Sequence, residues 1–272
     1  MKIIITVLAT LLFVASCKKS DEEKPEFAET KINLTTHTLS SFSAVKNSKY
    51  LVVFESGLGD DHSVWSRSTV ASQINSSSDV LMYDRAGYGK SETGPNPRTI
   101  ERLRSELESV IDKFSNGRKV ILIGHSLGGM IIRDYAVKNP LKTAALLFVD
   151  SSHENFNHPS QAEEDMLYEA SKKANGANFG GTLEARDFIE DLQYISKIPP
   201  LPNVPAIVLT SMQMDATHSL SVKQNWYDAH ELLKTGVTDF THVATTKAGH
   251  YIMIDEPALV VDNFKLLLSK LP

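Results

Sequence analysis

One serine in this sequence has the surroundings of a catalytic nucleophile. Ser126 is the centre of the pattern G-x-S-x-G at residues 124–128, which follows a Val-Ile-Leu-Ile run and precedes an apolar segment that suits a helix. A sharp turn between strand and helix strains the backbone of such a serine and exposes its hydroxyl, while the glycines let strand and helix pass closely. The positive end of the helix dipole points at the place where an oxyanion would develop. We therefore predict that Ser126 is a nucleophile.

The sequence predicts strands that alternate with helices, and the turn containing Ser126 lies between one such strand and the next helix. Short apolar or β-branched runs predict one or two edge strands at residues 30–42 and buried strands at 51–54, 80–83, 120–123, 145–149, 206–210 and 242–246. Helical spacing of apolar residues predicts helices at 100–114, with Thr99 as N-cap, at 221–234 and after Pro257. This order indicates an α/β fold with a mostly parallel central sheet flanked by helices.

Residues 151–203 interrupt the alternation. They lack strand signals and contain two helical stretches, at 161–173 and 182–196, joined by a glycine-rich hinge. Four prolines between 199 and 205 mark the return to the sheet. We interpret the segment as a small helical lid inserted after the sixth strand, within one domain of residues 30–272.

The N-terminus has the features of an exported and anchored protein. A positive Met-Lys pair precedes an apolar run at residues 3–14, too short to span a membrane comfortably, and the run ends in Val-Ala-Ser-Cys at Cys17. This ending resembles the lipobox of bacterial lipoproteins, which implies removal of residues 1–16 and acylation of Cys17. The charged residues 17–29 predict a flexible tether, and the acidic residues among them resemble outer-membrane targeting signals. We expect a lipid-anchored protein of the bacterial cell envelope; the alternatives are an ordinary signal peptide or a cytoplasmic apolar N-terminus.

Composition excludes several classes of function. The chain has 272 residues, 42% of them hydrophobic and 22% charged, which is ordinary for a soluble globular domain. A net charge of −5 argues against a nucleic-acid partner. Cys17 is the single cysteine, so the folded domain has no disulfide. His153-Glu154 and His158 have one residue too many for a zincin motif, and no glycine-rich nucleotide-binding motif is present, so we expect no metal and no cofactor.

Four motifs occur together in an order that resembles the α/β-hydrolase superfamily over residues 30–272. They are V-V-F-E-S-G-L-G at 52–59, Y-D-R-A-G-Y-G-K-S at 83–91, G-H-S-L-G-G at 124–129 and A-G-H-Y-I-M-I-D-E-P at 248–257. The resemblance implies an α/β-hydrolase fold with Ser126 as nucleophile and His250 as general base. A serine rather than an aspartate at the turn argues against dehalogenase and epoxide hydrolase chemistry.

The acid that orients His250 is Asp150 or Asp215. In the superfamily, a carboxylate at the end of either of the two preceding strands can serve, and the position after the later strand, which favours Asp215, is the commoner one. Here the loop after that strand is about one residue longer than usual and lacks the D-x-x-x-P pattern. The run V-D-S-S-H-E resembles a subgroup with the aspartate in the earlier position. We prefer Asp150 and keep Asp215 as the alternative.

The resemblance places the oxyanion hole at the backbone N–H groups of Leu58 and Leu127. Many members have His-Gly before the first of these residues, whereas this chain has Ser56-Gly57. The backbone donor remains, but the hydrogen bonds of that histidine are lost. The turn containing Asp84, by analogy with the family, buttresses the nucleophile turn.

We therefore expect a cofactor-free serine hydrolase that resembles carboxylesterases and cleaves a small or medium acyl ester through an acyl-enzyme. An amidase, thioesterase or lactonase would use the same residues, because the lid selects the substrate. The alternative of another class is a non-catalytic binding protein on the same fold. Its signature would be the loss of Ser126, His250 or both candidate acids, and all four residues are present.

Overall fold

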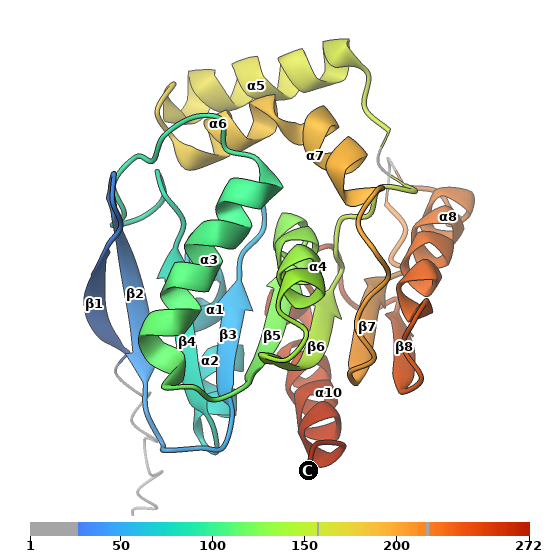
Figure 1. The fold of residues 1–272 in the computed structure, drawn as a ribbon. Helices are drawn as coiled ribbons and strands as arrows, with labels where there is room; N and C mark the ends of the chain where they lie inside the picture. Colours follow the sequence, from blue (N-terminus) through green and yellow to red (C-terminus); the bar gives the residue numbers. More distant parts are fainter. Residues whose placement is uncertain (1–26, 157, 216–217) are drawn as a thin grey trace, which may run out of the picture.

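An eight-stranded sheet forms the centre of the molecule (Figure 1). The computed structural model describes residues 27–156, 158–215 and 218–272, so the predicted signal peptide, Cys17 and nearly all of the tether lie outside the described residues. The strand order is β1-β2-β4-β3-β5-β6-β7-β8; β2 is antiparallel to both of its neighbours, and the other adjacent strands are parallel. The strands are β1 (Ala28–Asn33), β2 (Thr38–Ala44), β3 (Leu51–Glu55), β4 (Asp79–Asp84), β5 (Val120–His125), β6 (Thr143–Val149), β7 (Ala206–Ser211) and β8 (Phe240–Thr245).

Helices cover both faces of the sheet, which explains why the central strands are apolar without alternation. Successive residues of β5 point to opposite faces: Leu122 belongs to the core under α3 and α4, and Ile121 to the core under α2 and α10. The helices outside the lid are α1 (Ser63–Arg67), α2 (Val70–Asn75), α3 (Ile100–Ser115), α4 (Leu127–Lys138), α8 (Leu220–Glu231), the 3-10 helix η1 (Leu232–Lys234), α9 (Ile252–Asp255) and α10 (Pro257–Ser269). The mostly parallel sheet flanked by helices confirms the predicted fold class.

The lid follows β6, as predicted, and lies across the upper ends of the strands in Figure 1. It contains α5 (Gln161–Asn175), α6 (Gly180–Arg186) and α7 (Phe188–Ile195). The prediction of one continuous helix at 182–196 is wrong. The backbone leaves the helical region at Asp187, whose φ and ψ are −104° and 11°, and α7 begins at the next residue.

The break in the lid places two acidic side chains at the start of α3. Thr99 occupies the predicted N-cap position, but its side chain makes no capping hydrogen bond. Instead, Asp187 accepts a hydrogen bond from the backbone N–H of Arg98 (2.6 Å), and Asp191 accepts one from that of Ile100 (2.7 Å). These two bonds satisfy backbone donors that the helix itself cannot pair. The lid therefore supplies the cap of a core helix from a distant part of the chain.

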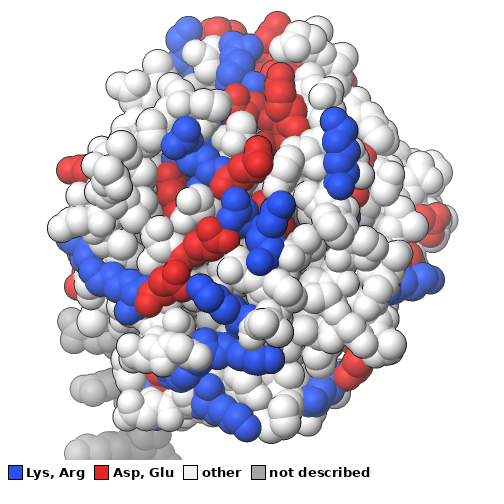
Figure 2. Space-filling model, viewed as in Figure 1, with Lys and Arg blue, Asp and Glu red and all other residues white. Residues whose placement is uncertain are grey.

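Charged side chains of both signs are interspersed over the face that carries α3 and the lid (Figure 2). Several are paired on the helix surfaces, as in Arg104 with Glu108 (2.6 Å) and Arg186 with Asp165 (2.6 Å). In the described part of the chain, no helix combines the length and the apolar character needed to cross a bilayer.

Candidate active site

Ser126 lies at the sharp turn between β5 and α4, as predicted. Its φ of 52° and ψ of −122° put a non-glycine residue in a strained region of backbone space. The flanking glycines are required by close contacts. A Cβ on Gly124 would lie 2.7 Å from the Gly128 carbonyl oxygen, and one on Gly128 would lie 2.5 Å from the Glu55 carbonyl oxygen. The strand, turn and helix therefore hold the serine at the carboxyl end of the central strand.

His250 and Asp150 form a hydrogen-bonded pair at the same edge of the sheet. Asp150, which directly follows β6 and has a φ of 44°, accepts a hydrogen bond from His250 Nδ1 through Oδ2 (2.7 Å). Its other oxygen, Oδ1, accepts hydrogen bonds from Trp226 Nε1 (2.7 Å) and the Ser211 backbone N–H (2.8 Å). Burial alone would raise the pKa of Asp150, but the hydrogen bond and charge of His250 lower it below the ordinary value. The carboxylate is thus buried, ionised and fixed in orientation.

Ser126, Asp150 and His250 line one cavity of about 340 Å³. The Ser126 hydroxyl also lies 3.5 Å from the hydroxyl of Ser152. The other lining residues are Ser152, Phe156, Gln213, Asp215, His218, Val222, Lys223, Trp226 and Gly249. A cavity of this size suits a small or medium organic ligand.

Asp215 lines this cavity but has a different histidine as its partner. It accepts hydrogen bonds from the backbone N–H of His218 (2.9 Å) and from His218 Nδ1 (2.8 Å). Just over half of its side chain is exposed. Of the two candidate acids, Asp150 is the one whose carboxylate contacts His250 Nδ1.

The loop after β3 passes directly beside Ser126. A Cβ on Gly57 would lie 2.9 Å from His125 Nδ1 and 3.2 Å from Ser126 Cβ, so the lack of a side chain at Gly57 lets the backbone approach the serine closely. The next residue is Leu58, and Leu127 begins α4. Within the described residues, the backbone N–H groups of Leu58 and Leu127 donate no hydrogen bond. Both donors remain available to an oxygen bound beside Ser126.

A buried arginine holds this loop, and sequence reasoning missed it. Arg85, 2% exposed, donates hydrogen bonds to the carbonyl oxygens of Ser56 (2.7 Å) and Gly57 (2.8 Å) and to the carboxylate of Glu55 (2.9 Å). It also donates two to Glu184 of α6, at 2.9 and 3.0 Å. The guanidinium therefore joins the lid to the loop that carries Leu58. The motif containing Arg85 was visible in the sequence, but its partner Glu184 lies 99 residues away.

Tyr88 adds a second connection between the lid and the same loop. Its hydroxyl donates a hydrogen bond to Glu184 (2.6 Å) and accepts one from the backbone N–H of Gly59 (3.1 Å). Where many family members have a histidine before the oxyanion residue, this chain holds the loop through Arg85, Tyr88 and the lid.

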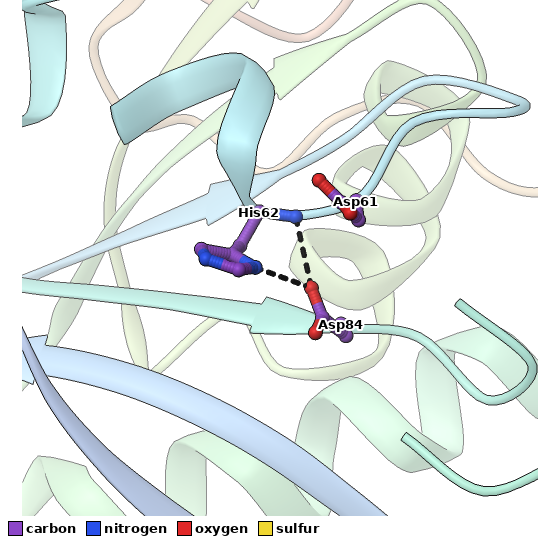
Figure 3. Close-up of side chains that lie close together, drawn as sticks. All are labelled: Asp61, His62 and Asp84. Carbon is purple, nitrogen blue, oxygen red and sulfur yellow. Dashed lines mark hydrogen bonds and ion pairs between the residues drawn. The ribbon is translucent and has the colours of Figure 1, made fainter. Parts of the chain in front are cut away.

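Asp84 organises the neighbouring turn, and with Asp61 and His62 it forms a compact group (Figure 3). It accepts hydrogen bonds from the backbone N–H (3.0 Å) and Nδ1 (2.6 Å) of His62, and from the backbone N–H of Lys90 (2.8 Å). Asp61 accepts one from the Ser63 backbone N–H (2.8 Å). The three side chains have ligand atoms within 4.8 Å of one another, close enough for a metal ion, but these hydrogen bonds already account for their arrangement.

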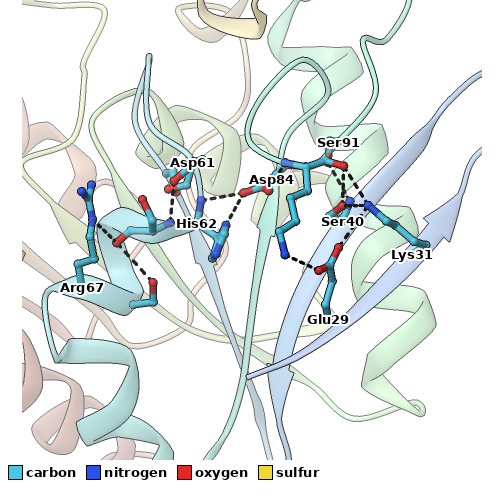
Figure 4. Close-up of polar contacts among 12 residues, drawn as sticks. Glu29, Lys31, Ser40, Asp61, His62, Arg67, Asp84 and Ser91 are labelled. Carbon is cyan, nitrogen blue, oxygen red and sulfur yellow. Dashed lines mark hydrogen bonds and ion pairs between the residues drawn. The ribbon is translucent and has the colours of Figure 1, made fainter. Parts of the chain in front are cut away.

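The polar contacts continue from this turn to the edge strands (Figure 4). Ser91 donates a hydrogen bond to the Asp84 carbonyl oxygen (2.6 Å) and accepts one from the Ser40 backbone N–H (2.8 Å). The expected structural role of Asp84 is consistent with this network, which links β2 and β4 to the loop beside the site.

Three buried histidines predict a stability that falls in acid. Burial lowers the pKa of His125 to about 3, and those of His153 and His230 to about 4. The unfolded chain therefore binds protons between pH 6.5 and about 4 that the folded protein does not bind. The free energy of unfolding should fall with decreasing pH in this window by about 1.4 kcal/mol per pH unit for each residue. We expect His153→Gln to reduce the slope measured by urea unfolding, and the exposed-site variant His158→Gln to leave it unchanged; equal slopes would contradict this account.

The geometry just described, a strained serine between a central strand and a helix beside a histidine–aspartate pair, defines the nucleophile-elbow class of α/β folds. A sequence model of the alpha/beta hydrolase fold matches residues 50–261. The chain belongs to the α/β-hydrolase fold family.

Individual proteins are similar to this chain over different shares of its length. The protein YqjL of Bacillus subtilis (strain 168) is 26% identical over 210 residues, which cover 77% of this chain and 79% of YqjL. The human mitochondrial palmitoyl-protein thioesterase ABHD10 is 33% identical over 69 residues, which are 25% of this chain and only 22% of that protein. The crystal structure of a hydrolase from Pseudomonas aeruginosa PA01 has a TM-score of 0.69 at 17% identity, covering 88% of this chain and 98% of that chain. At this identity the structural likeness shows the fold.

Proposed function

We propose that this protein is a serine hydrolase that cleaves a carboxylic ester through an acyl-enzyme. The observation that carries the proposal is the hydrogen bond between His250 Nδ1 and buried Asp150, in the same cavity as the strained Ser126. Because Nδ1 donates to the carboxylate, Nε2 of the neutral ring is left as the acceptor that a general base needs. Ser126 is then the nucleophile, His250 the base and Asp150 the orienting acid.

The reaction proceeds in two acyl transfers. Ser126 Oγ attacks the ester carbonyl while His250 takes its proton, and the N–H groups of Leu58 and Leu127 stabilise the oxyanion. His250 returns the proton to the departing alcohol, which leaves an acyl group on Ser126. Water then attacks this acyl group while His250 takes its proton. His250 gives that proton to Ser126 Oγ as the acid is released, which restores the neutral histidine and the free serine. Each backbone donor of this kind contributes about 10²–10³-fold to kcat.

A fluorophosphonate provides the direct test. We expect it to label full-length protein, purified in mild detergent, at Ser126, as located by mass spectrometry, and to abolish hydrolysis of p-nitrophenyl acyl esters. Ser126→Ala should lose the label. Ser152→Ala is the matched control because its hydroxyl lies only 3.5 Å away, and this variant should still be labelled at Ser126. A folded wild-type protein that neither reacts with the probe nor turns over any ester would refute the proposal.

Thioester cleavage is the second candidate, supported by the local match to ABHD10, which is named a palmitoyl-protein thioesterase. The same residues would perform it, since only the leaving group differs. Comparing oxygen esters and thioesters of equal acyl chain separates the two: a larger kcat/KM for the thioester after correction for intrinsic reactivity would favour this candidate.

A further inference from the structure

A lysine faces the same cavity as the proposed nucleophile. Lys223 lies on α8, is 7% exposed, and lines the cavity together with Ser126 and His250. Trp226 lies three residues further along α8, on the same side of the helix, and its indole donates to Asp150. This face of α8 is therefore directed at the site.

The side chain of Lys223 is mostly buried, and its ammonium group has no partner among the described residues. Among the described residues, Lys223 Nζ makes no ion pair within 4 Å and no hydrogen bond. Burial of an unpaired charge is unfavourable, so such groups are normally paired with a counter-charge. Nζ is not one of the buried polar atoms that lack a partner, so the aliphatic stem is buried while the ammonium reaches the open space of the cavity. An anion that enters the cavity can supply the counter-charge that the described residues do not.

The other charged groups of the cavity already have partners. Asp150 accepts a hydrogen bond from His250, and Asp215 accepts hydrogen bonds from His218. Lys223 is the one lysine or arginine among the described residues that line the cavity. A bound anion would therefore meet one cation that is not already neutralised.

We infer that the substrate carries an anionic oxygen group, a carboxylate or a phosphate, which pairs with Lys223 while its ester lies at Ser126. This inference rests on the proposed function and narrows it. The cavity of about 340 Å³ accommodates a short substrate, such as the monoester of a small dicarboxylic acid. Hydrolysis of that monoester consumes one water and releases an alcohol and a dicarboxylate, with chemistry unchanged at Ser126.

The test compares an anionic and a neutral ester of equal length. We expect the full-length protein to hydrolyse monoethyl glutarate with a higher kcat/KM than ethyl pentanoate, as followed by proton release. Lys223→Met should lower the ratio of the two kcat/KM values by about tenfold or more, because a hydrogen bond to a charged group is lost. Lys223→Arg, which keeps the charge, should retain part of the ratio. Ethyl 4-phosphonobutanoate, whose phosphonate group stands in for a phosphate, is assayed in the same way. The larger kcat/KM of this ester or of monoethyl glutarate identifies phosphate or carboxylate as the preferred anion.

Lys234→Met is the matched control. Lys234 ends η1, its side chain is 60% exposed and paired with Glu231, and it lies outside the cavity lining, so its loss should leave the ratio unchanged. A ratio that is the same in wild type and Lys223→Met would overturn the inference and show that only the stem of Lys223 matters. Ester hydrolysis itself would then still stand.

A binding measurement separates this inference from the proposed function. Monoethyl glutarate is titrated calorimetrically into Ser126→Ala protein with Lys223 either present or replaced by methionine. About tenfold weaker binding without Lys223 supports the anion site even if no ester is turned over. Equal binding in both proteins refutes it.

Discussion

Replacing Asp150 with asparagine is expected to lower kcat for ester hydrolysis by about 10⁴-fold, the effect of holding a catalytic histidine in the wrong tautomer. The hydrogen bonds at Oδ1 make this outcome specific. Two donors, Trp226 Nε1 and the Ser211 backbone N–H, converge on Oδ1 and require an acceptor there. The amide of an asparagine must therefore turn its NH₂ towards His250 Nδ1, which removes the proton from Nδ1 and places it on Nε2. The base is then already protonated on the nitrogen that should accept the serine proton.

Asp215→Asn is the matched control for this prediction. Its carboxylate is bonded to His218, so its loss should lower kcat by less than about tenfold, the scale of a side-chain change that leaves the tautomer of the base intact. Thermal unfolding of both variants establishes that each is folded. A larger loss in Asp215→Asn than in Asp150→Asn would assign the acid to the later strand.

The choice between these two acids shows what a sequence can and cannot predict. Both aspartates follow buried strands, so each was correctly expected at the carboxyl edge of the sheet. Which of them contacts His250 depends on where α8 and β7 place the donors to Oδ1, and these come from residues 76 and 61 positions away. Such contacts leave no periodic signal in the chain.

The strands were predictable for a physical reason. β3, β5, β6 and β7 are buried along their whole length between two layers of helices, so each is a continuous apolar run bounded by polar or glycine residues. The helices of the lid were harder to predict. The helical spacing of apolar residues continues through Asp187, whereas tertiary contacts end one helix before this residue and begin the next after it. The carboxylate of Asp187 accepts a hydrogen bond from the backbone N–H of Arg98, which lies 89 residues earlier in the chain.

The hydrogen bonds that hold the loop carrying Leu58 could not be predicted from the sequence for the same reason. The sequence shows that Ser56-Gly57 replaces the His-Gly pair common in the family, and it therefore predicts a loop without its usual support. The structure supplies the support from Arg85, which neutralises Glu55 and Glu184 while binding two loop carbonyl groups. One buried guanidinium thus serves stability and loop geometry together.

Arg85→Met should therefore have two separable effects. Two carboxylates, Glu55 and Glu184, lose their buried partner, which should reduce the free energy of unfolding by about 3–5 kcal/mol. The loop carrying Leu58 also loses two hydrogen bonds, which should lower kcat by about 10²-fold with a smaller change in KM, because the oxyanion is bound only in the transition state. Chemical unfolding and steady-state kinetics measure the two effects.

If Arg85→Met does not fold, Glu184→Gln still tests the predicted effect on kcat. Glutamine retains an acceptor for Arg85 and Tyr88 without the charge, so a smaller loss of kcat is expected, whereas Glu169→Gln on the exposed surface of α5 should have no effect. If kcat is unchanged in a folded Arg85→Met or Glu184→Gln protein, the lid does not position the loop.

The pH dependence of the Arg85→Met destabilisation identifies its cause. Burial raises the pKa of Glu55 to about 7, while the charge of Arg85 acts against this increase. Without Arg85 the pKa of Glu55 should rise further, so the folded variant holds a proton that the unfolded chain, with a pKa near 4.5, releases at neutral pH. When the pKa of a carboxyl group is higher in the folded than in the unfolded state, the free energy of unfolding decreases as the pH rises between the two pKa values. The loss of stability in Arg85→Met should therefore be smaller at pH 5 than at pH 8. A loss that does not depend on pH would mean that packing around the guanidinium, rather than its charge, holds the lid and the loop together.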